Sequence, residues 1–378
     1  MQNPFEITYF QTDKPDLKTA LEYLLQNIQN KEKILSLVFF GKADIDSYIS
    51  VSEEIKQIVL SQFPSTPLVT FITQPLCNAF TFGLEITKYN GDSVFDFKQS
   101  GDTRYVVFNS DWGKTVLIEG VKADSLFNDY TVQCNSVFEK ISAVLKTENV
   151  GIQHIVRQWN YIGNITDFEN GNQHYQLFNN SRSEFYKDID FENGYPAATG
   201  ISMSINSIFV SVLAIVPMNK TVISAIDNSL QIPAYKYSES VLVEGKTNPL
   251  TTTPKFERGK FITNGKSGIF YVSGTAAIRS EQSTSSNDAG LQTQFTIENI
   301  IYLISTGNLQ RYVIEKNVYL SLNSIRVYVK RCEDYTTIKA EVEKVWPNIN
   351  AIYLKAEVCR TELLVEIEGI ATLTSEGK

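Results

Sequence analysis

The feature that most constrains the fold of this chain is an internal repeat. The tripeptide Ile118-Glu119-Gly120 returns 154 residues later as Val272-Ser273-Gly274, and the apolar run at residues 208–216 returns 155 residues later at 363–371. Two nearly equal offsets at opposite ends of a segment indicate a duplicated unit. A degenerate third copy is expected at residues 16–89, so the starting hypothesis is one unit repeated along the chain.

The spacing of apolar residues predicts the same order of elements in each copy, namely helix, strand, helix, strand, strand. The first copy is expected to hold helices at 16–29 and 51–63, and strands at 34–40, 68–73 and 80–87. The second adds a leading strand at 115–118 to helices at 132–145 and 175–187, and to strands at 155–162, 200–205 and 208–216. The third has a leading strand at 268–272, helices at 292–305 and 335–345, and strands at 324–330, 351–358 and 363–370.

Such units are α/β, with helices covering one face of a mixed sheet. The other face of each sheet needs a partner, and three sheets around a common axis would bury one another. We therefore expect an intramolecular pseudo-trimer. The expected domains are a degenerate N-terminal unit at 1–98, a second unit at 99–218, a connecting excursion at 219–266 and a third unit at 267–378. The excursion is rich in Ser, Thr, Pro and Gly, which is typical of long loops.

Composition excludes several classes of function. Lys and Arg number 34 against 42 Asp and Glu, a net charge of −8 that argues against a nucleic-acid or anionic-membrane partner. The two histidines, His154 and His174, cannot build a three-histidine metal site. The four cysteines have no CxxC spacing, which argues against zinc-ribbon and thioredoxin-type sites. No metal site is therefore expected.

The location predicted from the sequence is the cytoplasm. Cys77, Cys134, Cys332 and Cys359 are scattered, which is typical of reduced thiols. Residues 1–10 lack the basic and apolar regions of a signal peptide. The longest apolar stretch, near 208–218, is about half of the ~20 residues that a membrane span needs.

Comparison of the copies draws attention to Glu366, because the same offset places Ser211 opposite it. Glu366 lies in the middle of an apolar strand, and strand alternation puts it on one face with Glu368. A carboxyl group there is costly unless it is paired or functional. The two interpretations are a solvated outer face and a general acid or base whose proton affinity is raised by desolvation.

Arginine is the residue that best recognises carboxylates in a bidentate way, and the nine arginines all follow residue 103. Arg157 lies in an unusually polar strand with Gln158, Asn160 and Tyr161, Arg331 ends the matching strand of the third unit, and Arg360 follows Cys359 just before Glu366. For the arginines other than Arg157 a surface salt bridge is the alternative, and for Cys359 a buried inert thiol. The small residues at 273–277 either admit a ligand close to the backbone or mark a bulge.

Several motifs together resemble the chorismatase family, within the YjgF-like superfamily. The motifs are Val156-Arg157-Gln158-Trp159-Asn160-Tyr161-Ile162, Tyr175-Gln176-x-Phe178-Asn179-x-x-Arg182, Pro196-Ala197-Ala198-Thr199-Gly200, Ser273-Gly274-Thr275-Ala276 and Cys359-Arg360-x-x-Leu363-Leu364-Val365-Glu366. The resemblance covers residues from about 150 to 370. It implies repeated YjgF-like (chorismate-mutase-like) α+β units with pockets between units.

The resemblance also implies an activity and a site. Chorismatases cleave chorismate to pyruvate and either a hydroxybenzoate or a dihydroxycyclohexadiene acid, without a metal or organic cofactor. Glu366 takes the place of the catalytic glutamate, and Cys359 resembles the product-tuning residue of the 3-hydroxybenzoate branch. The substrate-binding residues expected in addition are Arg157, Gln158, Asn160, Tyr161, Tyr235, Gly274, Ala276, Arg331 and Arg360.

Alternatives from other classes remain open at this stage. One is a catalytically silent YjgF-like protein that binds a small carboxylate, and another is an imine deaminase. The deaminases place an arginine after Pro-Ala, whereas Ala198 follows Pro196-Ala197 here. The segment after Tyr237 reads Ser-Glu-Ser, where the family usually has basic residues, and this puts the product type in doubt. The chain is expected to be a monomer or a homo-oligomer.

Overall fold

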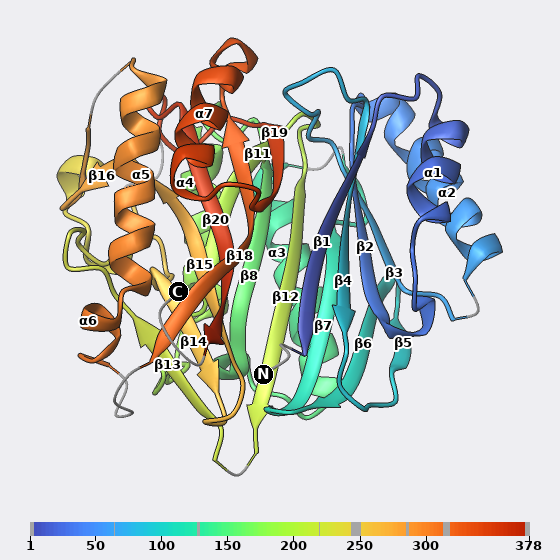
Figure 1. Ribbon diagram of the computed structural model, residues 1–378, viewed down its shortest axis with the longest axis horizontal. Coiled ribbons are helices and arrows are strands. Elements are labelled where there is room, and N and C mark those ends of the chain that lie inside the picture. The colour runs from blue at the N-terminus through green and yellow to red at the C-terminus, as the bar shows by residue number, and fades with distance from the viewer. Residues whose placement is uncertain are drawn as a thin grey trace.

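The computed structural model describes residues 4–63, 65–126, 129–218, 220–242, 251–284, 287–312 and 318–374. Its first sheet has the strand order β1-β4-β2-β3, with β1 antiparallel to β4 and β2 parallel to β3. Two helices cover the outer face of this sheet (Figure 1). The elements are β1 (Phe5–Thr12), α1 (Leu17–Gln26), β2 (Ile34–Phe40), α2 (Ile45–Gln62), β3 (Leu68–Ile72) and β4 (Phe82–Tyr89).

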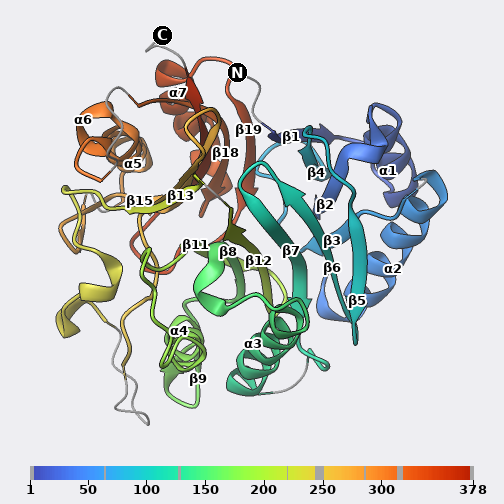
Figure 2. The same cartoon turned by 90° about the horizontal axis from the view of Figure 1, so that it is seen from below.

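The second sheet contains six strands in the order β5-β6-β7-β12-β8-β11. Helices α3 and α4 cover its outer face, and the short hairpin β9–β10 precedes α4 (Figure 2). The elements are β5 (Asp96–Ser100), β6 (Thr103–Ser110), β7 (Gly113–Lys122), α3 (Tyr130–Thr147), β8 (Ile155–Gly163), β9 (Phe168–Glu169), β10 (Asn172–Gln173), α4 (His174–Phe185), β11 (Ala197–Met203) and β12 (Ile208–Pro217).

The third sheet repeats that arrangement as β13-β14-β15-β20-β18-β19. Its outer face is covered by α5, α6 and α7, and β16 pairs with β17 as a separate hairpin. The elements are β13 (Val222–Ile226), β14 (Gly259–Thr263), β15 (Gly268–Ala276), β16 (Ile278–Arg279), β17 (Gln282–Ser283), α5 (Ala289–Ile304), α6 (Thr306–Leu309), β18 (Tyr319–Val329), α7 (Tyr335–Val345), β19 (Asn350–Lys355) and β20 (Val365–Thr374).

The three sheets share one topology, because β1-β4-β2-β3 matches the last four strands of each larger sheet. Seen along the axis, the sheets surround a common centre with their helices outside (Figure 2). One apolar cluster combines Leu35 of β2, Leu117 of β7 and Ile269 of β15, so the sheets bury one another. The predicted α/β class and the repeated units are confirmed.

Some strands were missed by the sequence patterns. Strand β1 lies before the expected first copy, and β5 and β6 begin in the segment between copies. Strands β13 and β14 lie within the expected excursion. The short apolar runs there are separated by Ser, Thr and Pro, so no alternation of apolar and polar residues marks a strand. Because both pair into the third sheet, we propose that the third unit begins at Val222, and that the second begins at Asp96.

Strand pairing also corrects the alignment of the copies. Ile118 of β7 pairs with Val212 of β12, whereas Val272 of β15 pairs with Gly369 of β20. The offset between β12 and β20 is therefore 157 residues, and Ser211 matches Glu368 instead of Glu366. Bulges in both ladders hide this shift from a comparison of sequence alone.

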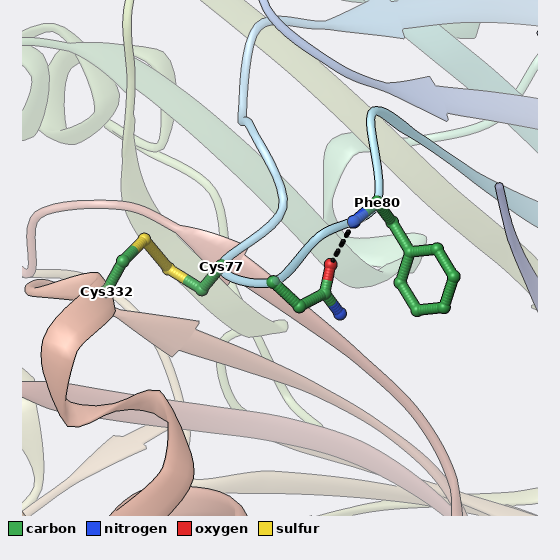
Figure 3. Close-up of a disulfide and its surroundings, with 4 residues drawn as sticks. Cys77, Phe80 and Cys332 are labelled. Atoms are coloured by element: carbon green, nitrogen blue, oxygen red, sulfur yellow. Dashed lines mark hydrogen bonds between the residues drawn. A yellow bond between two sulfur atoms is a disulfide. The ribbon is translucent and has the colours of Figure 1, made fainter. Parts of the chain in front are cut away.

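Cysteine pairing differs from the expectation of four reduced thiols. Cys77 and Cys332 form a disulfide that joins the segment after β3 to the segment after β18 (Figure 3). The two residues are 255 positions apart, and only the packing of the first unit against the third brings their Cα atoms to 4.9 Å. Cys134 and Cys359 are free. No helix in the part of the chain that the structure describes is long and apolar enough to cross a membrane.

Candidate active site

A pocket lies where the second sheet meets the third, between β11 and β15. Ala198 and Gly200 come from β11, Gly274 and Ala276 from β15, and Glu366 from β20. The Ala198 amide donates to the Ser273 hydroxyl across the boundary at 2.9 Å. The other lining residues are Gln173, Tyr175, Gln176, Asn179, Arg182, Tyr237, Val241, Leu242, Pro254, Phe256, Arg258, Ile278, Cys359, Arg360 and Leu363.

Glu366 is the acidic side chain of this pocket, and it is only 5% exposed. Burial raises the pKa of its carboxyl group to about 8, and the nearby Glu368 adds to the rise, while Arg157 and Arg258 oppose it. The carboxyl group is therefore protonated at neutral pH. A neutral carboxylic acid in a dry pocket is suited to give a proton to a bound molecule.

Gly274 sets the position of this acid. A Cβ atom at Gly274 would lie 2.1 Å from Oε1 of Glu366, so any side chain here would displace the carboxyl group. The Gly274 amide donates to the Thr199 hydroxyl at 3.0 Å, and the same hydroxyl donates to Glu368. Arg157 also donates to Thr199, at 2.7 Å. A buried polar network thus holds the backbone against which Glu366 lies.

Three arginines in the pocket have no acidic partner among the described residues: Arg182, Arg258 and Arg360. Arg182 is 2% exposed and Arg258 3%, and the Nε atom of each is buried without a hydrogen-bond partner. Buried guanidinium groups are costly unless an anion pairs with them. The pocket is therefore built for an anionic ligand.

Aromatic rings and a thiol complete the pocket. The guanidinium groups of Arg258 and Arg360 lie over the ring of Tyr237, at 5.7 and 5.3 Å. Cys359 lies near Glu366 and Tyr175, and burial raises the pKa of its thiol to about 12. The thiol is therefore neutral and acts as a small, weakly polar wall.

The structure brings together five of the residues singled out from the sequence, namely Glu366, Gly274, Ala276, Cys359 and Arg360. Arg157 lies outside the pocket lining and pairs with Glu368 at 2.6 Å. Gln158 and Asn160 hydrogen-bond to each other and to their surroundings within the second unit, and Tyr161 accepts from Arg326. Tyr235 packs on Tyr195, and Arg331 pairs with Asp334 near the surface, so neither lines the pocket.

Four of the lining residues that the sequence did not assign to the site come from helix α4, namely Tyr175, Gln176, Asn179 and Arg182. Tyr175, Asn179 and Arg182 follow one another at intervals of four and three residues, which puts them on one helix face, and Gln176 lies next to Tyr175. That periodicity was the signal that could have identified them. Arg258 lies at the start of β14, in a segment taken for a loop, and no pattern marked it. Within the described ranges, no group of three His, Cys, Asp or Glu side chains could hold a metal ion.

The chain thus consists of three repeated α/β units, with the pocket of Glu366 between the second and the third. Residues 98–214 match the family model described as chorismatase FkbO/Hyg5-like, N-terminal. A crystal structure of a chorismatase superposes with a TM-score of 0.70 at 19% identity, and the match covers 97% of this chain and 98% of that one. The family model thus matches the second unit, and the superposition shows that the chain has the fold of that chorismatase.

Two curated relatives give a similar result over part of their length. The chain is 32% identical to a 3-hydroxybenzoate synthase from Streptomyces hygroscopicus over 231 residues, which is 59% of this chain and 65% of that protein. It is 28% identical to a chorismatase from Streptomyces rapamycinicus over 231 residues, which is 58% of this chain and 65% of that protein. The matched segment thus spans slightly less than two thirds of each relative.

Proposed function

We propose that this protein is a cofactor-independent chorismatase that cleaves chorismate to pyruvate and a hydroxybenzoate, with 3-hydroxybenzoate favoured. The observation that carries the proposal is the pairing of a buried, protonated Glu366 with arginines that have no acidic partner in the described chain. Chorismate brings two carboxylates to meet those arginines and an enol ether that is cleaved by acid.

Binding is the first step of the proposed mechanism. Arg182 lies on α4 of the second unit, Arg258 lies just before β14 of the third unit, and Arg360 lies in the segment before β20. We assign one carboxylate of chorismate to Arg182 and the other to Arg258 and Arg360. Guanidinium groups suit this role because they present parallel donors to a carboxylate.

Proton transfer is the second step. Glu366 donates its proton to the terminal methylene carbon of the enol ether, which gives an oxocarbenium ion, and the carboxylate left behind stabilises that cation. Attack by the internal ring hydroxyl on the cation closes a cyclic ketal. One ring C–O bond and the bond from the ketal carbon to the other oxygen then break, so that pyruvate leaves with one oxygen as its carbonyl and the ring keeps the other. Loss of a ring proton gives the aromatic acid without net consumption of water. Attack by water gives the diene acid and consumes one water molecule. The proton released on aromatisation restores Glu366.

Cys359 is our candidate for the residue that favours the aromatic product. Its neutral thiol lies beside Glu366, and it is a small wall that leaves room for an internal oxygen at the cation. We expect Cys359→Val to increase the share of the diene acid. An unchanged product ratio would remove Cys359 from the mechanism.

The test is incubation with chorismate, followed by enzyme-coupled detection of pyruvate and chromatography of the ring products. Glu366→Gln should lower the rate of pyruvate release by about 10²–10⁴-fold, since a general acid is lost. Near-wild-type turnover in this variant would overturn the assignment of Glu366. Chorismate binding without pyruvate would favour the alternative of a silent carboxylate-binding protein.

We propose a cytoplasmic location, and the free thiols of Cys134 and Cys359 support it. The Cys77–Cys332 disulfide argues against the cytoplasm, because reducing compartments keep cysteines in the thiol form. Alkylation of cell extracts under denaturing conditions distinguishes the two. Four free thiols per chain would support the cytoplasm, and two would contradict it.

A further inference from the structure

A second cavity lies at the centre of the molecule, where all three sheets face one another. It has a volume of about 250 Å³ and shares no lining residue with the pocket of Glu366. Exposed Glu6 and Asn323 stand at its mouth. The lining residues that bear on its chemistry are Glu85, Glu119, Trp159, Leu213 and Tyr271.

The strand register relates three positions around this axis. Glu85 pairs with Val38, Ser211 with Trp159, and Glu368 with Arg326. The register places Glu85, Ser211 and Glu368 at equivalent places in the three units. The Ser211 hydroxyl donates to Oε2 of Glu119 at 2.8 Å, so Glu119 supplies the carboxyl group that Ser211 lacks. The centre therefore holds three carboxyl groups in a quasi-threefold ring.

Among the described residues, Arg157 and Arg326 are the cations that make ion pairs with this group of carboxyl groups. Arg326 makes a bidentate pair with Glu85, with distances of 2.6 and 2.5 Å, and it also lies 3.2 Å from Oε1 of Glu368. Arg157 pairs with Oε2 of Glu368 at 2.6 Å. Glu119 has no ion pair within the described part of the chain. Burial raises the pKa of its carboxyl group to about 7, and Glu85 adds to this rise.

The walls next to Glu119 suit an apolar ligand with a positive end. Trp159 and Tyr271 meet edge to face, with ring centroids 6.4 Å apart, and both line the cavity. Leu117, Leu213 and Ile370 form the remaining apolar surface. Aromatic rings attract organic cations, and the guanidinium groups of Arg157 and Arg326 already lie over the Trp159 ring at 4.8 and 5.9 Å. The partly buried carboxyl group of Glu119 adds the attraction of opposite charge.

We propose that the central cavity is a second binding site, for a small organic ammonium ion on a short apolar chain. The ammonium group pairs with Glu119 and completes the balance of three carboxylates and three cations. The apolar chain lies against Trp159, Tyr271 and Leu213. This site is independent of chorismate, so its test does not depend on the proposed function.

Calorimetric titration of the full chain with n-butylammonium chloride tests the proposal, and 1-butanol serves as the uncharged analogue of the same length. We expect one saturable site for n-butylammonium and at least tenfold weaker binding of 1-butanol. Glu119→Gln should weaken n-butylammonium at least tenfold, because it removes the charge and keeps the shape. Glu139→Gln on the exposed face of α3 is the matched control and should change nothing.

The proposal is overturned if n-butylammonium binds no more tightly than 1-butanol, or if Glu119→Gln binds it as the wild type does. Circular dichroism establishes whether Glu119→Gln is folded. If that variant does not fold, Leu213→Phe decides the question, because it narrows the cavity and leaves the carboxyl group in place. Binding that is unchanged in Leu213→Phe would then overturn the site.

Discussion

At the scale of single residues, the protonation of Glu366 governs what the pocket can do. Its carboxyl group has no hydrogen bond to a described residue, whereas Glu368 two positions later has two guanidinium partners. Both side chains are buried, on one strand and one face. The difference in partners leaves Glu366 as the acid that holds its proton, whereas Glu368 is an ion-paired part of the scaffold.

The first prediction concerns pH. Because the pKa of Glu366 is raised to about 8, the acid is protonated below that pH and loses its proton above it. We expect kcat/KM for chorismate to fall as pH rises through about 8, with a slope of −1 on a logarithmic plot. Stopped-time assays between pH 6 and 10 measure this. A rate that rises through pH 8 would mean that the carboxylate is the active form.

A second prediction concerns Gly274, which sets the position of the Glu366 carboxyl group. Gly274→Ala introduces a Cβ atom 2.1 Å from Oε1 of Glu366, and a shift of about 1 Å in a reacting group costs roughly 10²-fold in rate. We expect a loss of that order in kcat with the fold intact. Gly307→Ala is the matched control, because a Cβ atom there meets nothing within 4 Å. Equal activity in both variants would show that Gly274 does not position the acid.

At the scale of elements, helix α4 presents a polar face to the pocket. Gln173 at its N-terminal cap, followed by Tyr175, Gln176, Asn179 and Arg182, lines the pocket, while Phe178 packs inward on Phe138. Asn179 accepts from Arg182 at 2.6 Å and thereby orients its guanidinium group. A helix that covers a sheet in the other units is here part of the binding site.

The third prediction tests that face. Arg182→Gln should raise KM for chorismate by the equivalent of roughly 2–5 kcal/mol, because a buried charged partner is lost. Arg331→Gln should leave KM unchanged, since Arg331 pairs with Asp334 outside the pocket. Steady-state kinetics compare the two variants. A larger effect from Arg331 than from Arg182 would contradict the assignment of the anionic subsite.

The elements also show which parts of the fold and of the site could be predicted from the sequence. Strand β2 and helix α7 agree residue for residue with the apolar patterns, because β2 is a dense run of buried residues and α7 buries one face through Ile338 and Val342. Glu366 was singled out by an alignment of the copies that the strand pairing corrects, and by the family resemblance. Cys359 and Arg360 were found through the same resemblance and because they lie just before Glu366 in the sequence. Arg157 was misplaced, because a polar strand looks the same whether its side chains face a pocket or a buried ion network. Arg258 was missed, because the pattern of neighbouring residues in the sequence does not predict which side chains meet in a pocket between two units.

At the scale of the whole molecule, the first and third units are joined twice, by packing and by a covalent bond. Strand β1 contacts β19 through Asn350, which donates to the carbonyl of Ile7 at 2.7 Å. The Cys77–Cys332 disulfide closes the same boundary. The fourth prediction follows from that cross-link.

Cys77→Ser combined with Cys332→Ser should lower the free energy of unfolding by about 2–5 kcal/mol, because the cross-link restricts the unfolded chain. Denaturant unfolding of the variant and of the wild type measures the difference. Wild-type protein with a reducing agent should match the variant, which separates loss of the bond from any effect of the serines. Identical unfolding with and without reductant would mean that the bond is absent in solution.

Three boundaries between units exist, and their sequences have diverged. At the boundary of the second and third units, Gly274 leaves room for Glu366. At the boundary of the first and second units, Gly120 lies against Thr70. At the boundary of the first and third units, Gly83 lies against Ile352. In an assembly of identical chains, every substitution would appear three times at once. Fusion into one polypeptide frees each boundary to drift separately. One chain can therefore keep a pocket between the second and third units, fill the boundary of the first and second with the Thr70 side chain, and cross-link the first and third through the Cys77–Cys332 disulfide.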